Sequence, residues 1–375
     1  MLMREDLDVS IHPSFDNHEK VVMFTDQTTG LRAVIAVHNT NLGPSLGGCR
    51  IYPYADINDA VTDVLRLSKG MTYKSALAGL PLGGGKAVII GNPREIKKIG
   101  FMQSFGEAVE QMGGSYITAE DVGSTEEDMI EISKTTSYVA GLPETGAGEG
   151  VAGNPSPVTA YGVYCGLKAC TREKYRESNL KGRKIAIQGM GAVGYELAEY
   201  LAKDGAELWV ADIHQDVLDR AQQQFGAQVH ISPASEIHKL DVDIFAPCAL
   251  GAGLNDRTIP EIKAEIIGGA ANNQLAERRH DEMLREKGII YAPDYAINSG
   301  GITSVGYEYF WRTERNPYQY ELTRDTMMSH VSRIEETLGR VFTLADNKAI
   351  GTGEAADQLA EEIFKAGPST QTSVA

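Results

Sequence analysis

Residues 184–194 read Lys-Ile-Ala-Ile-Gln-Gly-Met-Gly-Ala-Val-Gly, a strand-forming run that leads directly into the pattern Gly-x-Gly-x-x-Gly. The pattern alone is weak, because glycine accounts for 40 residues of this chain. Its setting is more specific: a predicted helix follows to about Lys203, and the next apolar run, 208–211, ends at Asp212. This order is typical of a Rossmann dinucleotide site, and the alternative is a structural βαβ turn that binds nothing.

The chemistry of the motif favours one cofactor. The glycines permit a tight turn and a close approach of the backbone, so that a pyrophosphate can lie on the N-terminus of the next helix. Asp212 would accept hydrogen bonds from ribose hydroxyls and repel a 2′-phosphate, and no arginine follows it. The sequence therefore predicts NAD rather than NADP, bound by Gly189, Met190, Gly191, Ala192, Val193, Gly194 and Asp212.

Alternating strands and helices extend in both directions from this motif. Strands are expected at 21–25, 31–37, 87–90, 115–118, 244–246, 266–267 and 289–291, and helices at 60–71, 101–112 and, as one long amphipathic helix, 327–345. A glycine-rich segment, 141–157, is expected to be a hinge. The predicted fold class is α/β with two domains, a first α/β domain with a mixed sheet and a second Rossmann domain with a doubly wound sheet, with a cleft between them.

The expected domain boundaries follow from the same pattern. Residues 1–145, joined by C-terminal helices at about 345–366, would form a substrate-binding and oligomerisation domain. Residues 146–344 would form the NAD-binding domain, and residues 367–375 a disordered tail.

Composition excludes several classes of partner. A net charge of −16 argues against nucleic acid and against an anionic membrane surface. The N-terminus lacks the pattern of a signal peptide and no long apolar stretch follows, which predicts a cytoplasmic protein. The four cysteines are interpreted as reduced packing residues, and no metal site is expected.

Lys86 directly follows three glycines, Gly83–Gly85. A Walker phosphate loop is excluded, because Leu80 stands where its first glycine should be and Ala87 replaces its Ser/Thr. We expect the glycines to turn the chain tightly at positive φ just before a strand and to direct Lys86 into a cleft.

Lys86, Lys74 and Asp121 are candidates for acid–base chemistry on an anionic substrate. A local cation must bind the substrate in so acidic a chain, and hydride transfer also needs a proton donor or acceptor. All three residues are expected at the ends of elements in the first domain. The alternative is that the lysines are solvated and that Asp121 caps a helix.

Eight segments resemble the leucine/phenylalanine/valine dehydrogenases of the glutamate dehydrogenase superfamily, and leucine dehydrogenases most of all. They are residues 42–48, 70–74, 83–86, 118–123, 153–159, 246–249, 271–273 and 292–294. The similarity extends from about residue 15 to residue 365.

The resemblance implies a role for each matching residue. Lys74 would bind the substrate carboxylate, Lys86 would activate water, and Asp121 would exchange a proton with the amino group. Thr159 and Asn298 would hold the nicotinamide, with Cys248 and Ala249 also at the cofactor. Asn272 and Asn273 would contact the cofactor or the carboxylate, and the assignment between the two stays open.

The same resemblance implies a substrate pocket lined by Leu46, Gly47, Ala119, Ile302 and Val305. Such an apolar pocket would bury the side-chain carboxylate of glutamate without a partner, at a cost of several kcal/mol. The expected reaction is reversible NAD-dependent oxidative deamination of L-leucine and other branched-chain amino acids to 2-oxo acids and ammonia. Ala119 favours this choice, whereas Ile302 and the aromatic run 307–311 keep an aromatic substrate (phenylalanine or tryptophan) open. A non-catalytic NAD sensor is the other alternative, and a homo-oligomer, either an octamer or a dimer, is expected.

Overall fold

The computed structural model describes residues 1–143 and 150–367. Contacts divide the chain into two compact units. Unit 1 contains Met1–Asn154, Ile302–Met327 and the end of the chain from Ala360, and unit 2 contains Pro155–Gly301 and Met328–Leu359. The expected disordered tail, apart from Gly367, and part of the expected hinge, including Gly146 and Gly148, lie outside the described residues.

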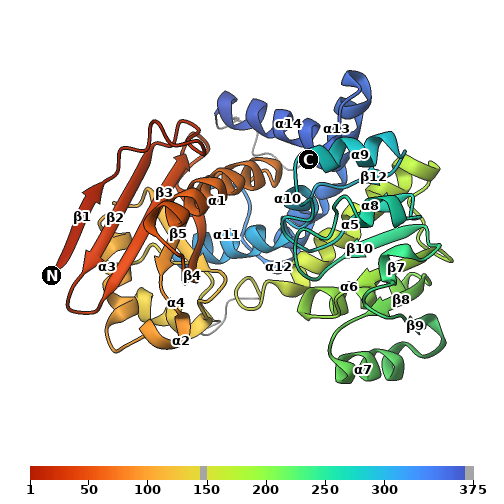
Figure 1. Ribbon diagram of the computed structural model, residues 1–375, viewed down its shortest axis with the longest axis horizontal. Coiled ribbons are helices and arrows are strands. Elements are labelled where there is room, and N and C mark those ends of the chain that lie inside the picture. Colours follow the sequence, from red (N-terminus) through yellow and green to blue (C-terminus); the bar gives the residue numbers. More distant parts are fainter. Residues whose placement is uncertain (144–149, 368–375) are drawn as a thin grey trace. The chain divides into compact units, whose positions relative to one another are not determined.

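Unit 1 is built on a mixed six-stranded sheet in the order β1-β2-β3-β5-β4-β6 (Figure 1). Strands β1, β2, β3 and β5 are antiparallel neighbours, whereas β4 runs parallel to both β5 and β6. The strands are β1 (Leu2–Asp6), β2 (Lys20–Asp26), β3 (Leu31–Asn39), β4 (Ser45–Tyr52), β5 (Gly83–Ile90) and β6 (Tyr116–Glu120).

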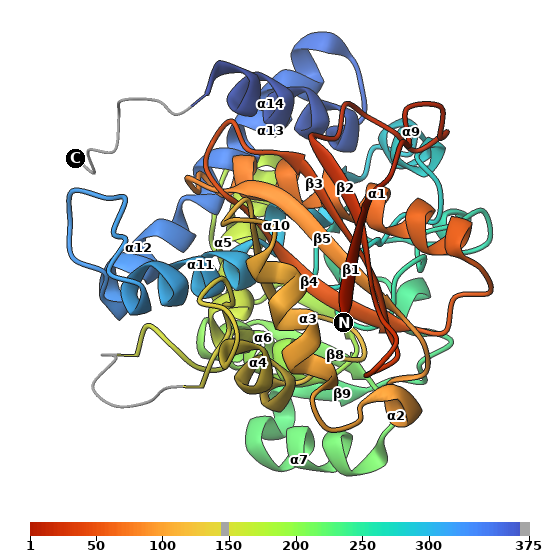
Figure 2. The same ribbon diagram turned by 90° about the vertical axis from the view of Figure 1, so that its left-hand side faces the viewer.

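Helices cover both faces of this sheet (Figure 2). On one face α1 (Ile57–Leu77) packs Val64 and Leu65 against Val34 and Val88. On the opposite face the apolar side of α3 (Phe101–Glu110) packs against the sheet. The other helices that follow the sheet strands are α2 (Pro93–Ile96) and α4 (Glu126–Ser133). The apolar residues that recur every 3.6 positions in α1 and α3 thus face the sheet, as the sequence indicates.

Unit 2 is built on a parallel six-stranded sheet in the order β12-β11-β10-β7-β8-β9. Strand order reverses between β7 and β10, which creates the switch point of a doubly wound sheet. The strands are β7 (Lys184–Gln188), β8 (Glu207–Ala211), β9 (Val229–Ile231), β10 (Ile244–Pro247), β11 (Ile266–Ile267) and β12 (Ile290–Tyr291). Between them lie α5 (Ser156–Tyr175), α6 (Ala192–Lys203), α7 (Gln215–Phe225), α8 (Thr258–Glu261), α9 (Arg279–Glu286) and α10 (Asp294–Ile297), with short 3₁₀ turns at Gly226–Gln228 and Ile237–Lys239.

The C-terminal part of the chain consists of helices α11 (Gly300–Arg312), α12 (Arg324–Ser332), α13 (Ile334–Lys348) and α14 (Thr352–Ala366). Residues from Ile302 to Met327 group with unit 1, because Glu308 accepts a hydrogen bond from Gly141 N (2.9 Å) and Arg312 donates one to the Val139 carbonyl. Residues 328–359 group with unit 2, because α13 packs on α5. This division differs from the expected one, which places 302–327 in the second domain and 345–359 in the first.

The expected α/β class with two domains, one with a mixed sheet and one with a doubly wound sheet, is confirmed, whereas three local predictions are wrong. The helix expected to end near residue 71 continues to Leu77, because Gly70 is tolerated inside it. The helix expected over 327–345 is two helices, separated by a turn at Arg333. The tight turn expected at Gly83–Gly85 is instead the start of β5, and none of these glycines has a positive φ.

The four cysteines are buried or half-buried, which agrees with their expected role as packing residues. Cys165 and Cys170 lie on α5, and all four cysteines are free. No helix within residues 1–143 and 150–367 is both long and apolar enough to cross a membrane.

Candidate active site

Lys86 lies inside β5, where close packing replaces the expected turn. A Cβ on Gly84 would lie 2.0 Å from the Thr72 nitrogen of α1, and a Cβ on Gly83 would lie 2.0 Å from the Asn39 carbonyl oxygen of β3. The bare glycine backbone therefore lets α1 and β3 approach this end of the strand. Lys86 itself is only 6% exposed.

The structure brings Lys86 and Asp121 together. Asp121 follows the last residue of β6, and its Oδ2 lies 2.8 Å from Lys86 Nζ. Burial opposes ionisation of the Asp121 carboxyl, but the positive charges of Lys86 and then Arg50 outweigh it and hold its pKa below the ordinary value. Within this pair a half-buried carboxylate is kept ionised and in hydrogen-bond contact with a buried lysine, which suits proton transfer.

Lys74 lies in the last turn of α1 and is half-buried. Its neighbours fix this end of the helix against β5: Thr72 packs on Gly84, and Ser75 Oγ donates to the Gly83 carbonyl at 3.3 Å. Two candidate lysines thus belong to elements in direct contact.

Three of the predicted pocket residues lie on adjacent strands. Leu46 and Gly47 are on β4, and Ala119 is on β6, whose register pairs it with Gly48. Leu46 and Ala119 are buried. Gly47 has no room for a side chain, because a Cβ would lie 1.9 Å from the Gly85 carbonyl oxygen.

The other two, Ile302 and Val305, lie on α11. Ile302 is buried and Val305 is half-buried. This helix approaches the segment before β5, because a Cβ on Gly306 would lie 3.2 Å from Leu82 Cδ1.

In unit 2 the three glycines of the Gly-x-Gly-x-x-Gly loop have three different environments. Gly189 has φ +95°, which side chains rarely adopt. A Cβ on Gly194 would lie 2.0 Å from the Gly189 carbonyl oxygen, whereas a Cβ on Gly191 would meet nothing within 4 Å. These are the requirements of a tight turn, a helix packed close to its strand, and an open approach for a ligand at the start of α6. Ala192 and Val193 form the first residues of that helix.

Asp212 follows β8 and holds the glycine loop. Its Oδ2 accepts a hydrogen bond from Met190 N at 2.7 Å, and its Oδ1 accepts one from His214 N at 2.9 Å. A carboxylate has about four acceptor positions, so both oxygens keep capacity for ribose hydroxyls.

Further predicted cofactor residues follow the strands of the same sheet. Cys248 and Ala249 come after β10, and a Cβ on Gly189 would lie 2.9 Å from Ala249 Cβ. Asn273 has φ +51° and donates its N–H to Asp294. Thr159 lies near the start of α5.

Asn298 is the most informative of these residues. It is 4% exposed, and its Nδ2 donates to Asn272 Oδ1 (2.9 Å) and to the Ala270 carbonyl (3.1 Å). Its Oδ1 is buried and accepts no hydrogen bond from any residue that the structure describes. A buried acceptor without a donor is costly, so this oxygen is suited to an N–H donor on a ligand.

Sequence reasoning missed Arg50, Asp63 and Tyr54. Arg50 Nε lies 3.2 Å from Asp121 Oδ2 and its Nη1 lies 3.0 Å from Asp63 Oδ2, to which Tyr54 also donates. One signal was present: an arginine between Cys49 and Ile51 in an apolar segment. The strand itself escaped prediction because Gly47-Gly48 interrupts it.

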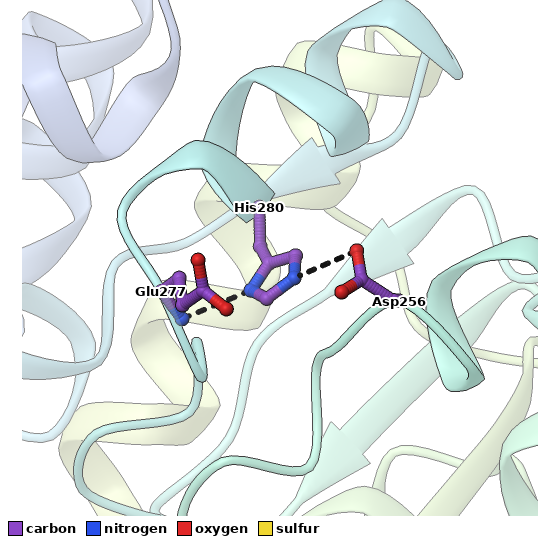
Figure 3. Close-up of side chains that lie close together, drawn as sticks. All are labelled: Asp256, Glu277 and His280. Atoms are coloured by element: carbon purple, nitrogen blue, oxygen red, sulfur yellow. Dashed lines mark hydrogen bonds and ion pairs between the residues drawn. The ribbon is translucent and has the colours of Figure 1, made fainter.

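A second polar cluster, formed by Asp256, Glu277 and His280, lies at the start of α9 (Figure 3). His280 Nδ1 accepts from Glu277 N at 2.9 Å, which leaves the proton on Nε2, 3.3 Å from Asp256 Oδ1. Arg279 pairs with both carboxylates. These bonds engage both ring nitrogens and place one positive charge between the two carboxylates, so the cluster holds the loop before α9 to the Asp256 segment.

Comparison with known proteins agrees with this geometry. Residues 16–138 match the family model for the Glu/Leu/Phe/Val dehydrogenase dimerisation domain, and residues 209–360 match the model for glutamate/leucine/phenylalanine/valine dehydrogenase. The chain is 47% identical to leucine dehydrogenase of Thermoactinomyces intermedius, covering 92% of this chain and 90% of that protein. It is 42% identical to phenylalanine dehydrogenase of Lysinibacillus sphaericus, covering 93% and 89%.

A solved structure gives the same result. The crystal structure of L-tryptophan dehydrogenase from Nostoc punctiforme superimposes with a TM-score of 0.81 at 39% identity, covering 93% of this chain and 96% of that one. The chain therefore belongs to the glutamate/leucine/phenylalanine/valine dehydrogenase family and is an amino-acid dehydrogenase.

Proposed function

We propose that the protein catalyses the reversible, NAD-dependent oxidative deamination of L-leucine and other branched-chain L-amino acids to 2-oxo acids and ammonia. The observation that carries this proposal is the pair formed by the buried Lys86 of β5 and the half-buried Asp121 after β6, 2.8 Å apart, and the helix end that bears Lys74 lies against β5. A family member that only sensed NAD would have no use for such a proton-transfer pair.

The proposed steps assign one task to each side chain. Lys74 binds the α-carboxylate, and Asp121 takes a proton from the ammonium group, because hydride cannot leave a carbon that bears an ammonium. NAD, held by the Gly189–Gly194 loop, Asp212 and Asn298, would supply the acceptor for the hydride of the α-carbon. Lys86 then takes a proton from the water that attacks the resulting iminium carbon, and the carbinolamine so formed loses ammonia when Asp121 returns its proton to the nitrogen. Asn272 or Asn273 contacts the carboxylate or the cofactor.

The unit 2 residues fit NAD. The open space above Gly191 admits a pyrophosphate. The buried Asn298 Oδ1 suits the amide N–H of the nicotinamide carboxamide, and the proposal assigns Thr159 to the same carboxamide. Cys248 and Ala249 would flank the glycine turn. Asp212 favours NAD over NADP, because its carboxylate would repel a 2′-phosphate.

Apolar residues support a branched aliphatic substrate. Leu46, Ala119 and Ile302 are all buried, and none of the five proposed pocket residues offers a partner to a side-chain carboxylate. Glutamate would therefore lose several kcal/mol on binding.

An aromatic substrate is the second candidate. A relative named phenylalanine dehydrogenase and a solved structure named tryptophan dehydrogenase are also similar to this chain. One methylene in a hydrophobic pocket changes specificity by only about 1–3 kcal/mol, so the substrate range is expected to be broad. We further propose that the protein acts in the cytoplasm as a homo-oligomer, a dimer or an octamer.

The test is to measure NADH and NADPH formation with a panel of L-amino acids at alkaline pH. The proposal expects turnover with leucine, isoleucine and valine, little with glutamate, and a preference for NAD. Higher kcat/KM for phenylalanine or tryptophan would move the assignment to the aromatic candidate. Absence of turnover with every amino acid, while NADH still binds, would contradict the proposal.

A further inference from the structure

The carboxylate of Asp121 is contacted by two cations from two different strands. Lys86 Nζ lies 2.8 Å and Arg50 Nε 3.2 Å from the same oxygen, Oδ2. In the sheet order β5-β4-β6, Lys86 belongs to β5, Arg50 to β4, and Asp121 follows β6. The two cations therefore come from neighbouring strands and meet at one oxygen of a carboxylate that follows the third strand.

Arg50 is anchored at its other end. Its Nη1 lies 3.0 Å from Asp63 Oδ2 on α1, and the Tyr54 hydroxyl donates to the same oxygen at 2.5 Å. The guanidinium is planar and rigid, so contacts with two carboxylates fix its orientation.

The main chain of Asp121 is tied to the same strand. Its N–H donates to Ser124 Oγ at 2.9 Å, and that hydroxyl donates to the Cys49 carbonyl at 2.9 Å. A Cβ on Gly48 would lie 2.7 Å from Asp121 Cβ, so the strand backbone abuts the carboxylate. Strand β4 thus holds both the backbone and the side chain of Asp121.

Several other charged or titratable groups interact with this site. Cys49 comes from β4, Tyr116 and Glu120 from β6, Asp63 from α1, and Tyr54 from the segment between β4 and α1. Lys86 and Arg50 are the two cations that oppose the effect of burial on the Asp121 carboxyl. Only one of these two cations is permanent, because arginine does not lose its proton in proteins.

We propose that Arg50 is the positioning residue for proton transfer at Asp121: it orients the carboxylate and keeps it ionised during the part of the cycle in which Lys86 is neutral. This inference rests on the proposed roles of Lys86 and Asp121. If Lys86 takes a proton only after losing its own, the Lys86–Asp121 ion pair is interrupted, and Arg50 supplies the remaining charge. Asp63 and Tyr54 hold Arg50 in place for this purpose.

The test compares pH profiles of kcat for leucine deamination in five proteins: wild type, Arg50→Gln, Arg50→Lys, Asp63→Asn, and the control Arg66→Gln. Arg66 is an exposed arginine on α1. Ionised Asp121 accepts the ammonium proton, and Arg50 lowers its pKa. Removing Arg50 therefore raises that pKa and shifts the acid limb of the profile to higher pH.

Arg50→Gln is expected to lower kcat by roughly 10- to 100-fold, with KM for leucine and the Kd of NADH nearly unchanged. Arg50→Lys keeps the positive charge but loses the planar guanidinium that contacts two carboxylates, so kcat falls while the acid limb moves less than in Arg50→Gln. Asp63→Asn leaves the charge and loosens its position, so kcat falls without a shift of the limb. Arg66→Gln is expected to match wild type.

An Arg50→Gln enzyme that folds and has the wild-type acid limb would overturn the proposal, because a merely structural role changes the active fraction and the thermal midpoint but not the limb. If Arg50→Gln does not fold, Arg50→Lys and Asp63→Asn decide, and wild-type kcat in both would overturn it. Failure of the proposed function is distinguishable: wild type would lack amino-acid turnover, or Asp121→Asn would retain full activity.

Discussion

Two glycine-rich segments of this chain have similar composition and opposite physical roles. In Gly83–Gly85 the glycines lie in an extended strand and are needed because there is no room for side chains. In Gly189–Gly194 the first glycine is needed for its positive φ, and the second faces open space. The first segment brings α1 against the strand that carries Lys86, and the second leaves a surface where a ligand can approach.

The difference shows that a glycine count alone does not reveal why glycine is required. Space around the missing Cβ separates the two roles, and it also predicts different consequences of substitution. Substitution in the first segment should damage the fold, whereas substitution at Gly191 should damage ligand binding and leave the fold intact.

The largest loss of stability is expected for Gly84→Ala. The new methyl group would lie 2.0 Å from Thr72 N and 2.2 Å from Thr72 Oγ1, so α1 must move and displace Lys74. Overpacking of this kind costs about 3 kcal/mol of unfolding free energy. Thermal and denaturant unfolding would measure the loss, together with kcat/KM for leucine.

Gly70→Ala is the matched control on the same helix. A Cβ there meets nothing within 4 Å, so the change should stabilise the protein by up to about 1 kcal/mol through helix propensity. Equal stabilities for Gly84→Ala and Gly70→Ala would show that close packing does not define the first segment.

A smaller and different effect is expected for Gly191→Ala. Its φ of −69° suits any residue and its surroundings are open, so the midpoint of unfolding should not change. The methyl group would instead obstruct the pyrophosphate, and the Kd of NADH should rise roughly tenfold, equivalent to about 1.4 kcal/mol. Fluorescence titration with NADH measures this, and a lowered unfolding midpoint with unchanged NADH affinity would reverse the roles given to the two segments.

The smallest effect concerns His38, which supports the first segment through Thr72. His38 Nδ1 lies 2.8 Å from Thr72 Oγ1, and its ring also faces His18 and Asp16. Burial, followed by the nearby His18, lowers the pKa of His38 from 6.5 to about 4. Because the folded state favours neutral His38, its contribution to stability is full above about pH 6.5 and is lost as the pH falls towards 4.

Unfolding midpoints of wild type should therefore decline over this pH range, and the decline should be shallower in His38→Gln. His214→Gln, a change at an exposed histidine, is the control. Identical pH dependence in wild type and His38→Gln would remove His38 from the account of the first segment.

Unit 2 was the more predictable part of the molecule. Its strands β7, β8, β10 and β11 are short, continuous apolar runs, and the order of strand, glycine turn, helix and acid indicated their topology. In unit 1, β4 was missed because paired glycines interrupt its pattern, and α1 was ended too early at a glycine that the helix accommodates.

Only the site residues that belong to recognisable sequence motifs could be predicted. Lys86, Asp121 and the glycine loop came from such motifs, but Arg50 did not. Its partners, Asp63 and Asp121, are 13 and 71 residues away in sequence, and only the pairing of β4 with β6 and the position of α1 bring them together. Long-range contacts of this kind depend on the fold rather than on local spacing.

Lys86→Ala tests whether Lys86 acts in catalysis rather than in cofactor binding, with Lys98→Ala as the control at an exposed lysine of the same unit. NADH formation from leucine and NADH binding would both be measured for each variant. We predict that Lys86→Ala loses turnover by a factor of at least roughly 10³ and binds NADH with wild-type affinity, because the proposed cofactor residues belong to unit 2. Substantial turnover in Lys86→Ala, or loss of NADH binding, would contradict this prediction.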